Sequence, residues 1–264
     1  MASRLVAVIL TKNEARHIAA CIQSVSWCDG VLLSDSYSSD GTPEIAQQLG
    51  AEVVQRPFTS FADQRNSALS DARARGAEWV FFIDADERAT PALAEEIRRA
   101  IQESRAGWWV PRYNYIMGHR MRGGGWYPDP QLRLLRVDRA RYDPARPVHE
   151  TVILEGEAGT LKEHLIHYNY DSLAQFLAKQ NRYLTLEARM LHEQGVRPRP
   201  RNYLSMPLRE FWRRYVSLQG YRDGPLGLLL CSLMGWYKFK AYRELARLCR
   251  TGSISPDKAG ASAA

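Results

Sequence analysis

One short stretch, an apolar run followed at once by three carboxylates, constrains the fold of this chain more than any other. Residues 79–83 read Trp-Val-Phe-Phe-Ile and carry no charge, which is typical of a strand buried on both faces of a parallel sheet. Residues 84–87 read Asp-Ala-Asp-Glu and stand where that strand ends. Ligands of open α/β sheets collect at the carboxyl ends of the strands, so the sequence predicts a site there.

Asp84 and Asp86 are separated by one residue and can turn toward a single cation. Mg²⁺ and Mn²⁺ prefer such oxygen ligands and keep part of their hydration shell. The alternative is a solvated acidic turn that caps the helix beginning near Thr90 and Pro91, because acidic residues stabilise helix N-termini. A D-x-D pattern by itself favours the turn, and its place after a buried strand favours the site.

Strand and helix signals alternate over the first hundred residues. Such repeated units predict an α/β fold with a mostly parallel sheet and right-handed crossovers, a doubly wound half-domain that binds a nucleotide. The sequence has no G-x-G-x-x-G after the first strand and no G-x-x-x-x-G-K-[ST], which disfavours the standard dinucleotide and P-loop sites. The predicted strands are 5–10, 30–33, 52–54 and 79–83, and the predicted helices are 13–25, 42–49, 61–75 and 91–103.

The pattern changes after residue 107. Residues 108–110 and 132–137 look like strands of a mixed sheet, and we expect the glycine-rich loop at 117–130 to serve the acceptor or act as a lid. Residues 173–194 predict a helix, and the alternating prolines of 197–201 predict a linker. The expected organisation is a catalytic domain at 1–170 with halves 1–106 and 107–170, a helical extension at 171–250 and a flexible tail at 251–264.

Basic residues are concentrated in the C-terminal part of the chain. Between Gly195 and Arg250, twelve lysines and arginines stand against three acidic residues, a net charge of +9, so the rest of the chain carries −2 of the formal total of +7. This asymmetry indicates an anionic partner, either a membrane surface or a nucleic acid.

The same region contains an apolar run, Gly224–Tyr237. As a helix it would be about 20 Å long, short of the roughly 30 Å hydrocarbon core of a bilayer. We therefore expect it to lie in the interface of an anionic membrane, with aromatic residues at headgroup depth. A buried packing helix or a dimer contact is the alternative.

The remaining composition indicates a globular protein with reduced thiols. Its hydrophobic fraction of 45% and charged fraction of 25% are ordinary. Cys21, Cys28, Cys231 and Cys249 form no C-x-x-C pair, so neither a zinc site nor a disulfide framework is expected. A strand begins at Leu5, which leaves no room for a signal peptide, and we expect a cytoplasmic location on the inner face of the cell membrane.

Four polar segments line up with the ends of the predicted strands: residues 10–14 (Leu-Thr-Lys-Asn-Glu), 35–42 (Asp-Ser-Tyr-Ser-Ser-Asp-Gly-Thr), 64–66 (Gln-Arg-Asn) and 84–87. In this order and spacing the chain resembles glycosyltransferase family 2, the inverting nucleotide-sugar enzymes of GT-A fold, over roughly residues 5–170. It is most similar to the branch that contains lipopolysaccharide-core beta-glucosyltransferases, which share a D-A-D-E, a later H-E and a basic apolar C-terminus.

The resemblance implies a role for each segment. It places Thr11, Glu14 and Asp35 against the nucleoside, where the Asp35 carboxylate can accept the imide N–H of uracil. A cap for the following turn is the alternative for Asp35. Glu14 has a second interpretation as the cap of the first helix. Arg65 is implied to pair with diphosphate oxygens, with a plain surface arginine as the alternative, and Asn66 to hold its loop.

The D-x-D segment completes the implied donor site. In the family, the first aspartate reaches the ribose side and the second binds the metal, here Asp84, beside Ala85, and Asp86. His167, within Leu-Ile-His-Tyr at 165–168, is a candidate to complete the metal shell or to bond the diphosphate, as a late histidine does in several GT-A enzymes. A satisfied core histidine is the alternative.

His149 and Glu150 follow Pro-Val at the expected end of another strand. Inverting transfer needs one general base near the acceptor hydroxyl, while the metal stabilises the departing diphosphate. The resemblance makes Glu150 that base, with His149 as a supporting neighbour. The E-D pair of many family members is missing here, and a surface glutamate beside a structural histidine is the alternative.

Taken with the resemblance, the sequence predicts a glycosyltransferase that uses Mg²⁺ or Mn²⁺. The expected donor is a nucleotide sugar, UDP-glucose, and the expected acceptor is a lipid-linked saccharide such as a lipopolysaccharide core. Another nucleotide sugar or a polyprenyl phosphate acceptor is the nearest alternative. A basic protein that binds nucleic acid or membrane without catalysis is an alternative from another class, but the basic and aromatic residues are not interleaved as nucleic-acid grooves require, so no nucleic-acid partner is expected.

Overall fold

The computed structural model describes residues 4–143 and 152–251, and they form two compact units. The first unit comprises residues up to 113 together with 130–167, and the second comprises 114–129 together with residues from 168 onward. Most of the glycine-rich loop at 117–130 therefore belongs to the same unit as the C-terminal helices.

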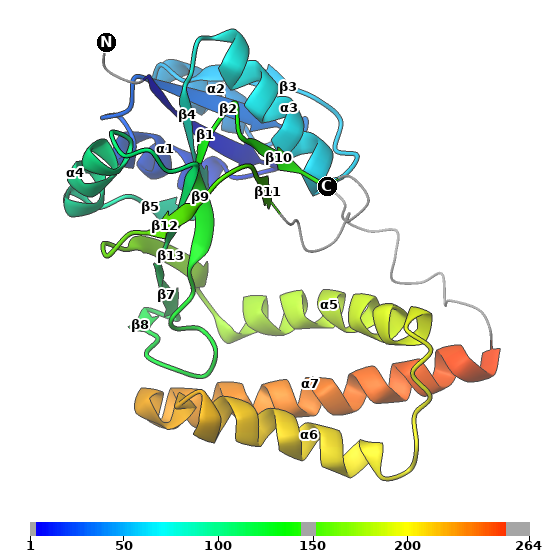
Figure 1. Ribbon diagram of the computed structural model, residues 1–264. Helices are drawn as coiled ribbons and strands as arrows, with labels where there is room; N and C mark the ends of the chain where they lie inside the picture. The colour runs from blue at the N-terminus through cyan, green and yellow to red at the C-terminus, as the bar shows by residue number, and fades with distance from the viewer. Residues whose placement is uncertain (1–3, 144–151, 252–264) are drawn as a thin grey trace. The chain divides into compact units, whose positions relative to one another are not determined.

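A seven-stranded sheet forms the centre of the first unit (Figure 1). Its strands, in spatial order, are β12 (Ala158–Thr160), β6 (Gly107–Val110), β9 (Gln131–Arg136), β4 (Trp79–Asp84), β1 (Leu5–Thr11), β2 (Gly30–Asp35) and β3 (Glu52–Gln55). The neighbours from β4 to β3 are parallel, whereas β9 runs antiparallel to both β4 and β6. The predicted parallel half with a mixed continuation is confirmed.

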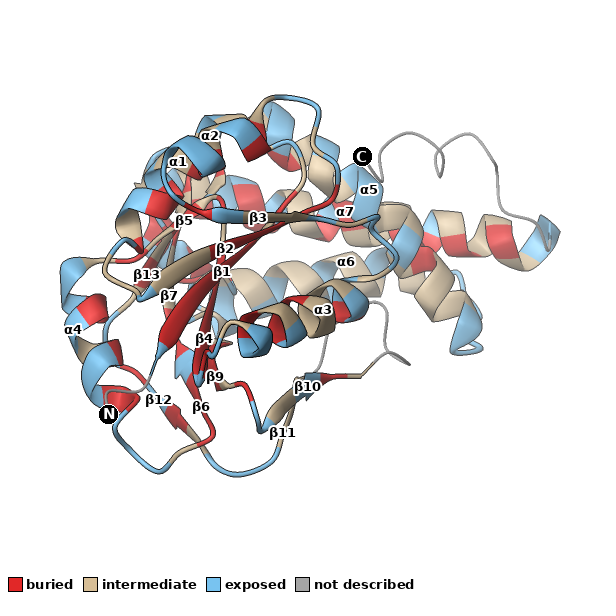
Figure 2. Ribbon diagram, turned by 90° about the horizontal axis from the view of Figure 1, so that it is seen from above, coloured by how far each residue is buried: buried red, intermediate tan, exposed pale blue. Residues whose placement is uncertain are grey.

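Helices cover both faces of this sheet: α1 (Ala15–Ser24), α2 (Thr42–Gln48), α3 (Phe61–Ala74) and α4 (Pro91–Ala100). Successive residues of β1 point to opposite faces, so Ile9 packs in one core with Ile18 of α1, and Val8 packs in the other with Leu69 of α3. Because an apolar core lies on each face of the sheet, both sides of β4 are covered and its residues 79–83 carry no charge. All five are buried (Figure 2).

The carboxyl ends of three neighbouring strands meet at one edge of the sheet. Thr11 of β1 lies beside Asp35 of β2, and Leu10 of β1 lies beside Asp84 of β4. The polar segment of α3 joins them, because Gln64 Nε2 donates to the carbonyl oxygen of Ser34 at 3.3 Å. All four polar segments are therefore neighbours in space.

Short antiparallel strand pairs, which the sequence analysis did not predict, complete the strand inventory of the described residues. In the first unit, β5 (Glu87–Arg88) pairs with β13 (Leu165–Tyr170), and β10 (Ala140–Tyr142) pairs with β11 (Val152–Leu154). In the second unit, the end of β7 (Arg112–Ile116) pairs with β8 (His119–Arg120). The β5–β13 pair places His167 opposite Glu87.

The second unit is built mainly from helices (Figure 1). They are α5 (Leu173–Glu193), α6 (Asn202–Trp212), the π-helical η1 (Arg213–Ser217), the 3₁₀-helical η2 (Gly220–Asp223) and α7 (Gly224–Thr251). α7 packs against both α5 and α6. Among the helices that the structure describes, α5 to α7 included, none is both long enough and apolar enough to cross a bilayer.

The apolar run Gly224–Tyr237 forms the first half of α7 and has two different sides. Leu230 and Cys231 are fully buried within the unit, whereas Leu228, Leu229 and Trp236 are exposed. One side of the run is therefore a packing surface, which was the alternative to a purely membrane-facing helix.

Gly227 allows α7 to approach η2 closely. A Cβ atom built on Gly227 would lie 2.0 Å from the carbonyl oxygen of Gly220, a backbone atom that cannot move aside alone. We expect Gly227→Ala to lower the free energy of unfolding by about 1 to 3 kcal/mol, the usual cost of overpacking, despite the better helix propensity of alanine. Urea unfolding measures this change. Gly30→Ala, whose new Cβ would meet its nearest neighbour at an ordinary 3.8 Å, is the control and should change stability much less.

Candidate active site

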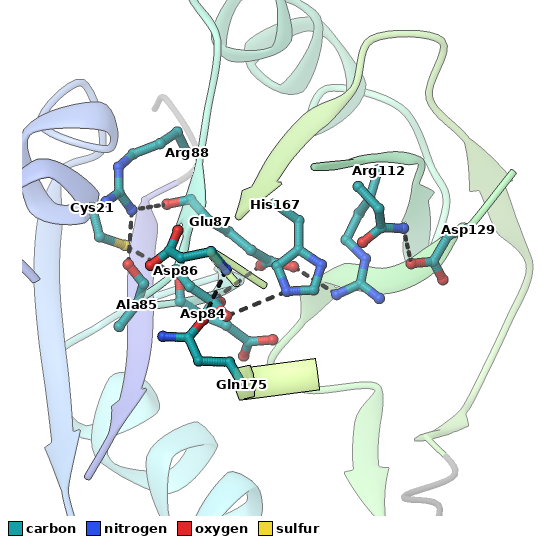
Figure 3. Close-up of polar contacts among 12 residues, drawn as sticks. Cys21, Asp84, Ala85, Asp86, Glu87, Arg88, Arg112, Asp129, His167 and Gln175 are labelled. Atoms are coloured by element: carbon teal, nitrogen blue, oxygen red, sulfur yellow. Dashed lines mark hydrogen bonds and ion pairs between the residues drawn. The ribbon is translucent and has the colours of Figure 1, made fainter. Parts of the chain in front are cut away.

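The turn at residues 84–87 is fastened to the first unit through its backbone (Figure 3). Glu87 Oε2 accepts the N–H of Asp84 at 2.9 Å and so closes the turn on itself. The Cys21 thiol donates to the carbonyl oxygen of Asp84 at 3.4 Å, and Arg88 Nη1 donates to that of Ala85 at 2.7 Å. Burial raises the pKa of Cys21, which keeps this thiol protonated and able to donate. The backbone of the D-A-D-E segment is therefore fixed by side chains of two elements, α1 and β5.

Two arginines neutralise the carboxylates on the inner side of the turn. The Glu87 side chain is completely buried, and its Oε1 accepts from Arg112 Nη1 at 2.8 Å and from Arg133 Nη2 at 3.3 Å. Arg133 also binds both carboxylate oxygens of Asp84. A buried carboxylate is costly unless it is paired and hydrogen-bonded, and this pair of guanidinium groups meets both requirements.

The charges around Asp84 lower its pKa. Burial alone would raise the pKa of this carboxyl group, but Arg133, followed by Arg65 and Arg112, outweighs burial and holds the pKa well below its usual range. Asp84 is therefore ionised at neutral pH, and its side chain remains 36% exposed.

Asp86 and His167 come together beside this cluster (Figure 3). His167 Nε2 lies 3.3 Å from Asp86 Oδ2, and the two side chains are 10% and 29% exposed. The pairing of β13 with β5 holds the histidine there. In the described residues no group of three or more His, Cys, Asp or Glu side chains gathers around a possible metal position. Mg²⁺ and Mn²⁺ sites commonly use one or two protein carboxylates with water and substrate oxygens, so Asp86 could serve as such a ligand, with His167 beside it.

Arg65 and Asn66 of α3 have separate tasks. The Arg65 guanidinium lies 5.1 Å from the ring centroid of Phe82 and 5.5 Å from that of Tyr142, and its Nη2 is 3.9 Å from Asp84 Oδ1. Asn66 donates to the carbonyl oxygen of Tyr142 at 2.9 Å and accepts its N–H at 2.8 Å. The predicted role of Asn66 in holding a loop is consistent with this pair of hydrogen bonds, which fixes the end of β10.

The expected nucleoside residues form a dense hydrogen-bond group at the ends of β1 and β2. Asp35 is 1% exposed, and its carboxylate accepts from Thr11 Oγ1 at 2.9 Å, from Ser38 N at 2.8 Å and from Gln55 Nε2 at 3.0 Å. The Ser38 hydroxyl donates to it as well. In this arrangement Asp35 organises the loop, and its contact with a nucleobase stays a prediction.

Glu14 stands at the N-cap of α1, but its side chain makes no capping hydrogen bond. Its backbone N–H instead donates to Thr42 Oγ1 at 2.8 Å, which ties the first polar segment to the second. The alternative in which the Glu14 side chain caps the first helix is therefore wrong in this structure.

His149 and Glu150 lie outside the described residues, and their roles stay predictions. The sequence analysis missed Arg112 and Arg133 entirely, and it did not separate Glu87 from the two aspartates before it. Arg133 did carry a signal, since a charged residue stands inside the apolar strand segment 132–135.

The ion pair between Asp84 and Arg133 predicts how the stability of the protein changes at acidic pH. A carboxyl group whose pKa is lowered by folding stabilises the native state above its unfolded pKa of about 3.9, and this contribution is lost as pH falls below that value. We expect Asp84→Asn to reduce the free energy of unfolding by about 1 to 2 kcal/mol at pH 7, a value kept modest by the exposure of the side chain. The deficit should shrink between about pH 4 and pH 2.5.

Urea unfolding across this pH range measures the deficit. Glu157→Gln, which alters a carboxylate whose side chain is 88% exposed, is the control and should cost little at any pH. A deficit for Asp84→Asn that stays constant down to pH 2.5 would contradict the assigned ion pair.

Solved structures resemble this chain only in broad outline. The mannosyl-3-phosphoglycerate synthase from Rubrobacter xylanophilus has a TM-score of 0.46 at 18% identity, with 75% of this chain and 78% of that chain covered. The glucosyl-3-phosphoglycerate synthase from Mycobacterium tuberculosis, solved with Mn²⁺, UDP and glucosyl-3-phosphoglycerate, has a TM-score of 0.46 at 18% identity, with 74% and 81% covered.

Sequence comparison is more specific. The chain is 31% identical over 248 residues to the lipopolysaccharide core biosynthesis glycosyltransferase LpsC of Rhizobium meliloti (strain 1021), with 89% of each protein covered. It is 26% identical to a glycosyltransferase of Rickettsia bellii (strain RML369-C), with 97% of this chain and 92% of the relative covered. The model of the family described as Glycosyl transferase family 2 matches residues 6–168. The chain therefore belongs to glycosyltransferase family 2.

Proposed function

We propose that this glycosyltransferase is an inverting, metal-dependent enzyme that transfers glucose from UDP-glucose to a lipid-linked saccharide such as a lipopolysaccharide core. The observation that carries the proposal is the approach of His167 Nε2 to Asp86 Oδ2, at 3.3 Å, where β4 ends. Beside it, the guanidinium of Arg65 lies at the same strand end, with its Nη2 3.9 Å from Asp84 Oδ1. A metal-ligand pair next to a guanidinium group suits a nucleoside diphosphate.

Asp86 and His167 would hold the divalent cation, Mg²⁺ or Mn²⁺. When bound, the ion would offset the negative charge that develops on the diphosphate as it leaves the sugar. The fixed backbone of the turn supports this assignment, since a ligand carboxylate on a rigid segment needs no reorganisation when the ion arrives.

The remaining donor contacts follow from the positions of the polar segments. Arg65 would bind diphosphate oxygens from α3, and Asp84, with Ala85, would lie along the ribose. Thr11, Glu14 and Asp35 would line the nucleoside at the ends of β1 and β2. The register of these strands supports the grouping, because Thr11 lies beside Asp35 and Leu10 beside Asp84.

Glu150 is the proposed general base, and His149 its neighbour. A base must lie within hydrogen-bond reach of the acceptor hydroxyl and accept its proton as the new bond forms. Asp129, which accepts from Asn114 Nδ2 at 2.9 Å, and the exposed Glu155 are the next candidates if Glu150 is not the base.

The acceptor and the location of the enzyme rest on two further observations. LpsC, the relative that shares 31% identity, is described by its name as acting in lipopolysaccharide core biosynthesis. The net charge of +9 between residues 195 and 250 favours an anionic membrane surface, where a lipid-linked acceptor would be found and where the enzyme would be held peripherally on the cytoplasmic side. A different nucleotide sugar or a polyprenyl phosphate acceptor would use the same machinery.

The metal assignment predicts the behaviour of Asp86→Ala. We expect the wild-type protein to bind UDP-glucose in the presence of Mn²⁺, and the variant to lose this metal-dependent binding while it stays folded, since one of two protein ligands is removed. Titration calorimetry with UDP-glucose, with and without Mn²⁺, measures the effect. Asp138→Ala, a carboxylate 49% exposed in the same unit, is the control.

Two results would contradict this assignment. Full metal-dependent affinity in Asp86→Ala would remove the aspartate from the site. If the wild-type protein binds GDP-mannose or another nucleotide sugar but not UDP-glucose, the proposed transferase activity stands and the proposed donor is wrong.

The base assignment predicts that Glu150→Gln slows transfer by roughly 10²- to 10⁴-fold, the usual share of general-base catalysis. Donor affinity should change little, because the amide keeps the shape of the carboxylate and loses only its basicity. Turnover assays with a lipid-linked saccharide acceptor measure the effect, and Glu157→Gln, which alters a carboxylate whose side chain is 88% exposed, is the control. A loss below about tenfold, less than general-base catalysis supplies, would place the base elsewhere.

A further inference from the structure

The exposed side of α6 and η1 has an unusual composition. From residue 201 to residue 217, every residue that is exposed is an arginine, a large apolar residue or a serine. Leu204, Leu208 and Trp212 are 69%, 57% and 62% exposed. We call these residues the α6 face: Arg201, Leu204, Leu208, Arg209, Trp212, Arg213, Val216 and Ser217.

The apolar residues of the α6 face form one continuous stripe. Leu204, Leu208 and Trp212 recur every four residues, and residues spaced in this way lie on the same side of an α-helix. The opposite side of α6 is already used, because Met206 packs with α7 residues in a small core and Pro207 lies close to Gly235. The stripe is therefore additional to the surface that holds the helix in its unit.

A hollow opens next to the stripe. It has a volume of about 810 Å³, and its lining combines apolar side chains, among them Leu208, Phe211 and Trp212, with the cations Arg209, Arg213 and Lys238. One carboxylate, Glu210, also lines it and is bound by Arg213 and Arg214. Such a lining is complementary to an anionic phospholipid. The apolar side chains can contact its acyl chains, and the cations can bind its phosphate.

Acidic residues are absent from the exposed surface in this part of the chain. Between residues 197 and 251, Glu210 is bound by Arg213 and Arg214, Glu244 by Arg247, and Asp223 is buried against the backbone N–H groups of Arg122 and Gly123. None of these three is exposed. Besides Arg213, which binds Glu210, seven arginines are exposed: Arg197, Arg199, Arg201, Arg209, Arg222, Arg243 and Arg250.

We propose that the α6 face is the surface by which this protein lies on an anionic lipid bilayer. Leu204, Leu208 and Trp212 enter the boundary between headgroups and acyl chains, with the helix in the plane of the membrane, and the flanking arginines bind lipid phosphates. The proposal deepens the function proposed above by giving the membrane partner a defined binding surface. The proposed function supplies the reason for membrane binding. The lipid contact itself needs neither a nucleotide sugar nor a metal ion.

Two other occupants fit the α6 face less well. A second copy of this chain would bring arginines against arginines across a symmetric contact, which is unfavourable without acidic partners. A nucleic acid would match the arginines but would leave Leu204 and Leu208 against a polar backbone. An anionic bilayer satisfies both the charges and the apolar stripe.

Point substitutions test the surface better than deletion, because α7 supplies buried residues such as Leu230 and its removal would open the core of the unit. The test variant is Leu204→Gln/Leu208→Gln/Trp212→Gln. The matched control is Leu186→Gln, an exposed leucine on α5 of the same unit (39% exposed). Glutamine is a good helix former, and thermal unfolding followed by circular dichroism confirms that each variant is folded.

Sedimentation with vesicles measures the binding. The wild-type protein should bind phosphatidylglycerol vesicles and bind pure phosphatidylcholine vesicles much less. The triple variant should bind the anionic vesicles at least about tenfold more weakly, and Leu186→Gln should bind like the wild type. Arg201→Gln/Arg209→Gln should lose about fivefold per arginine, and only on anionic vesicles.

A spectroscopic readout places the contact directly. Brominated phosphatidylglycerol quenches tryptophan fluorescence at acyl depth, so Trp212→Phe should remove most of the quenching seen with the wild-type protein. Persistence of that quenching, or equal vesicle binding by the triple variant, would overturn the proposal. A concentration-dependent dimer of the wild type that the triple variant abolishes would assign the face to a second copy instead.

Donor binding separates this inference from the proposed function. UDP-glucose titrations with Mn²⁺ should give the same result for the wild type and for the triple variant, because no residue of the α6 face belongs to the donor site. Failure of the wild type to bind any nucleotide sugar would remove the proposed function and leave the vesicle result to stand by itself.

Discussion

The buried carboxylate of Glu87 is the interaction on which the candidate active site depends. It closes the turn by accepting the Asp84 N–H, and it is itself held by Arg112 and Arg133. A carboxylate without solvent contact survives only when its charge is compensated, so the two arginines and the turn stabilise one another. Because Arg133 also binds Asp84, the same guanidinium group orients the first aspartate of D-x-D, while Asp86 lies beside His167.

The architecture of the first unit could be predicted from the sequence, whereas the partners inside the site could not. The β4 run and the helices around it follow from local apolar patterns, and the observed ends of α3, Phe61–Ala74, differ from the predicted 61–75 by a single residue. Arg133 lies 49 residues from Asp84 along the chain, and no local pattern specifies which distant arginine meets which carboxylate. Such pairing depends on the order of strands in the sheet, which places β9 beside β4.

The C-terminal region shows what composition alone leaves open. Hydropathy identified the run Gly224–Tyr237, but it did not distinguish the buried side of α7, with Leu230 and Cys231, from its exposed side. It also gave little weight to α6, whose leucines are diluted by arginines and by a proline, Pro207. The surface of a helix is set by which residues share a side, so the exposed stripe on α6 became visible only once its packing against α7 was known.

The hydrogen bond from Cys21 to the carbonyl oxygen of Asp84 has a chemical consequence beyond geometry. Oxidants and alkylating reagents attack the thiolate, and burial raises the pKa of Cys21 so that almost none is present at neutral pH. An oxidised sulfur could no longer donate to the carbonyl oxygen of Asp84, and the turn would lose one of the hydrogen bonds that hold its backbone. The burial that positions the Cys21 thiol as a donor therefore also shields its sulfur from reagents that attack the thiolate.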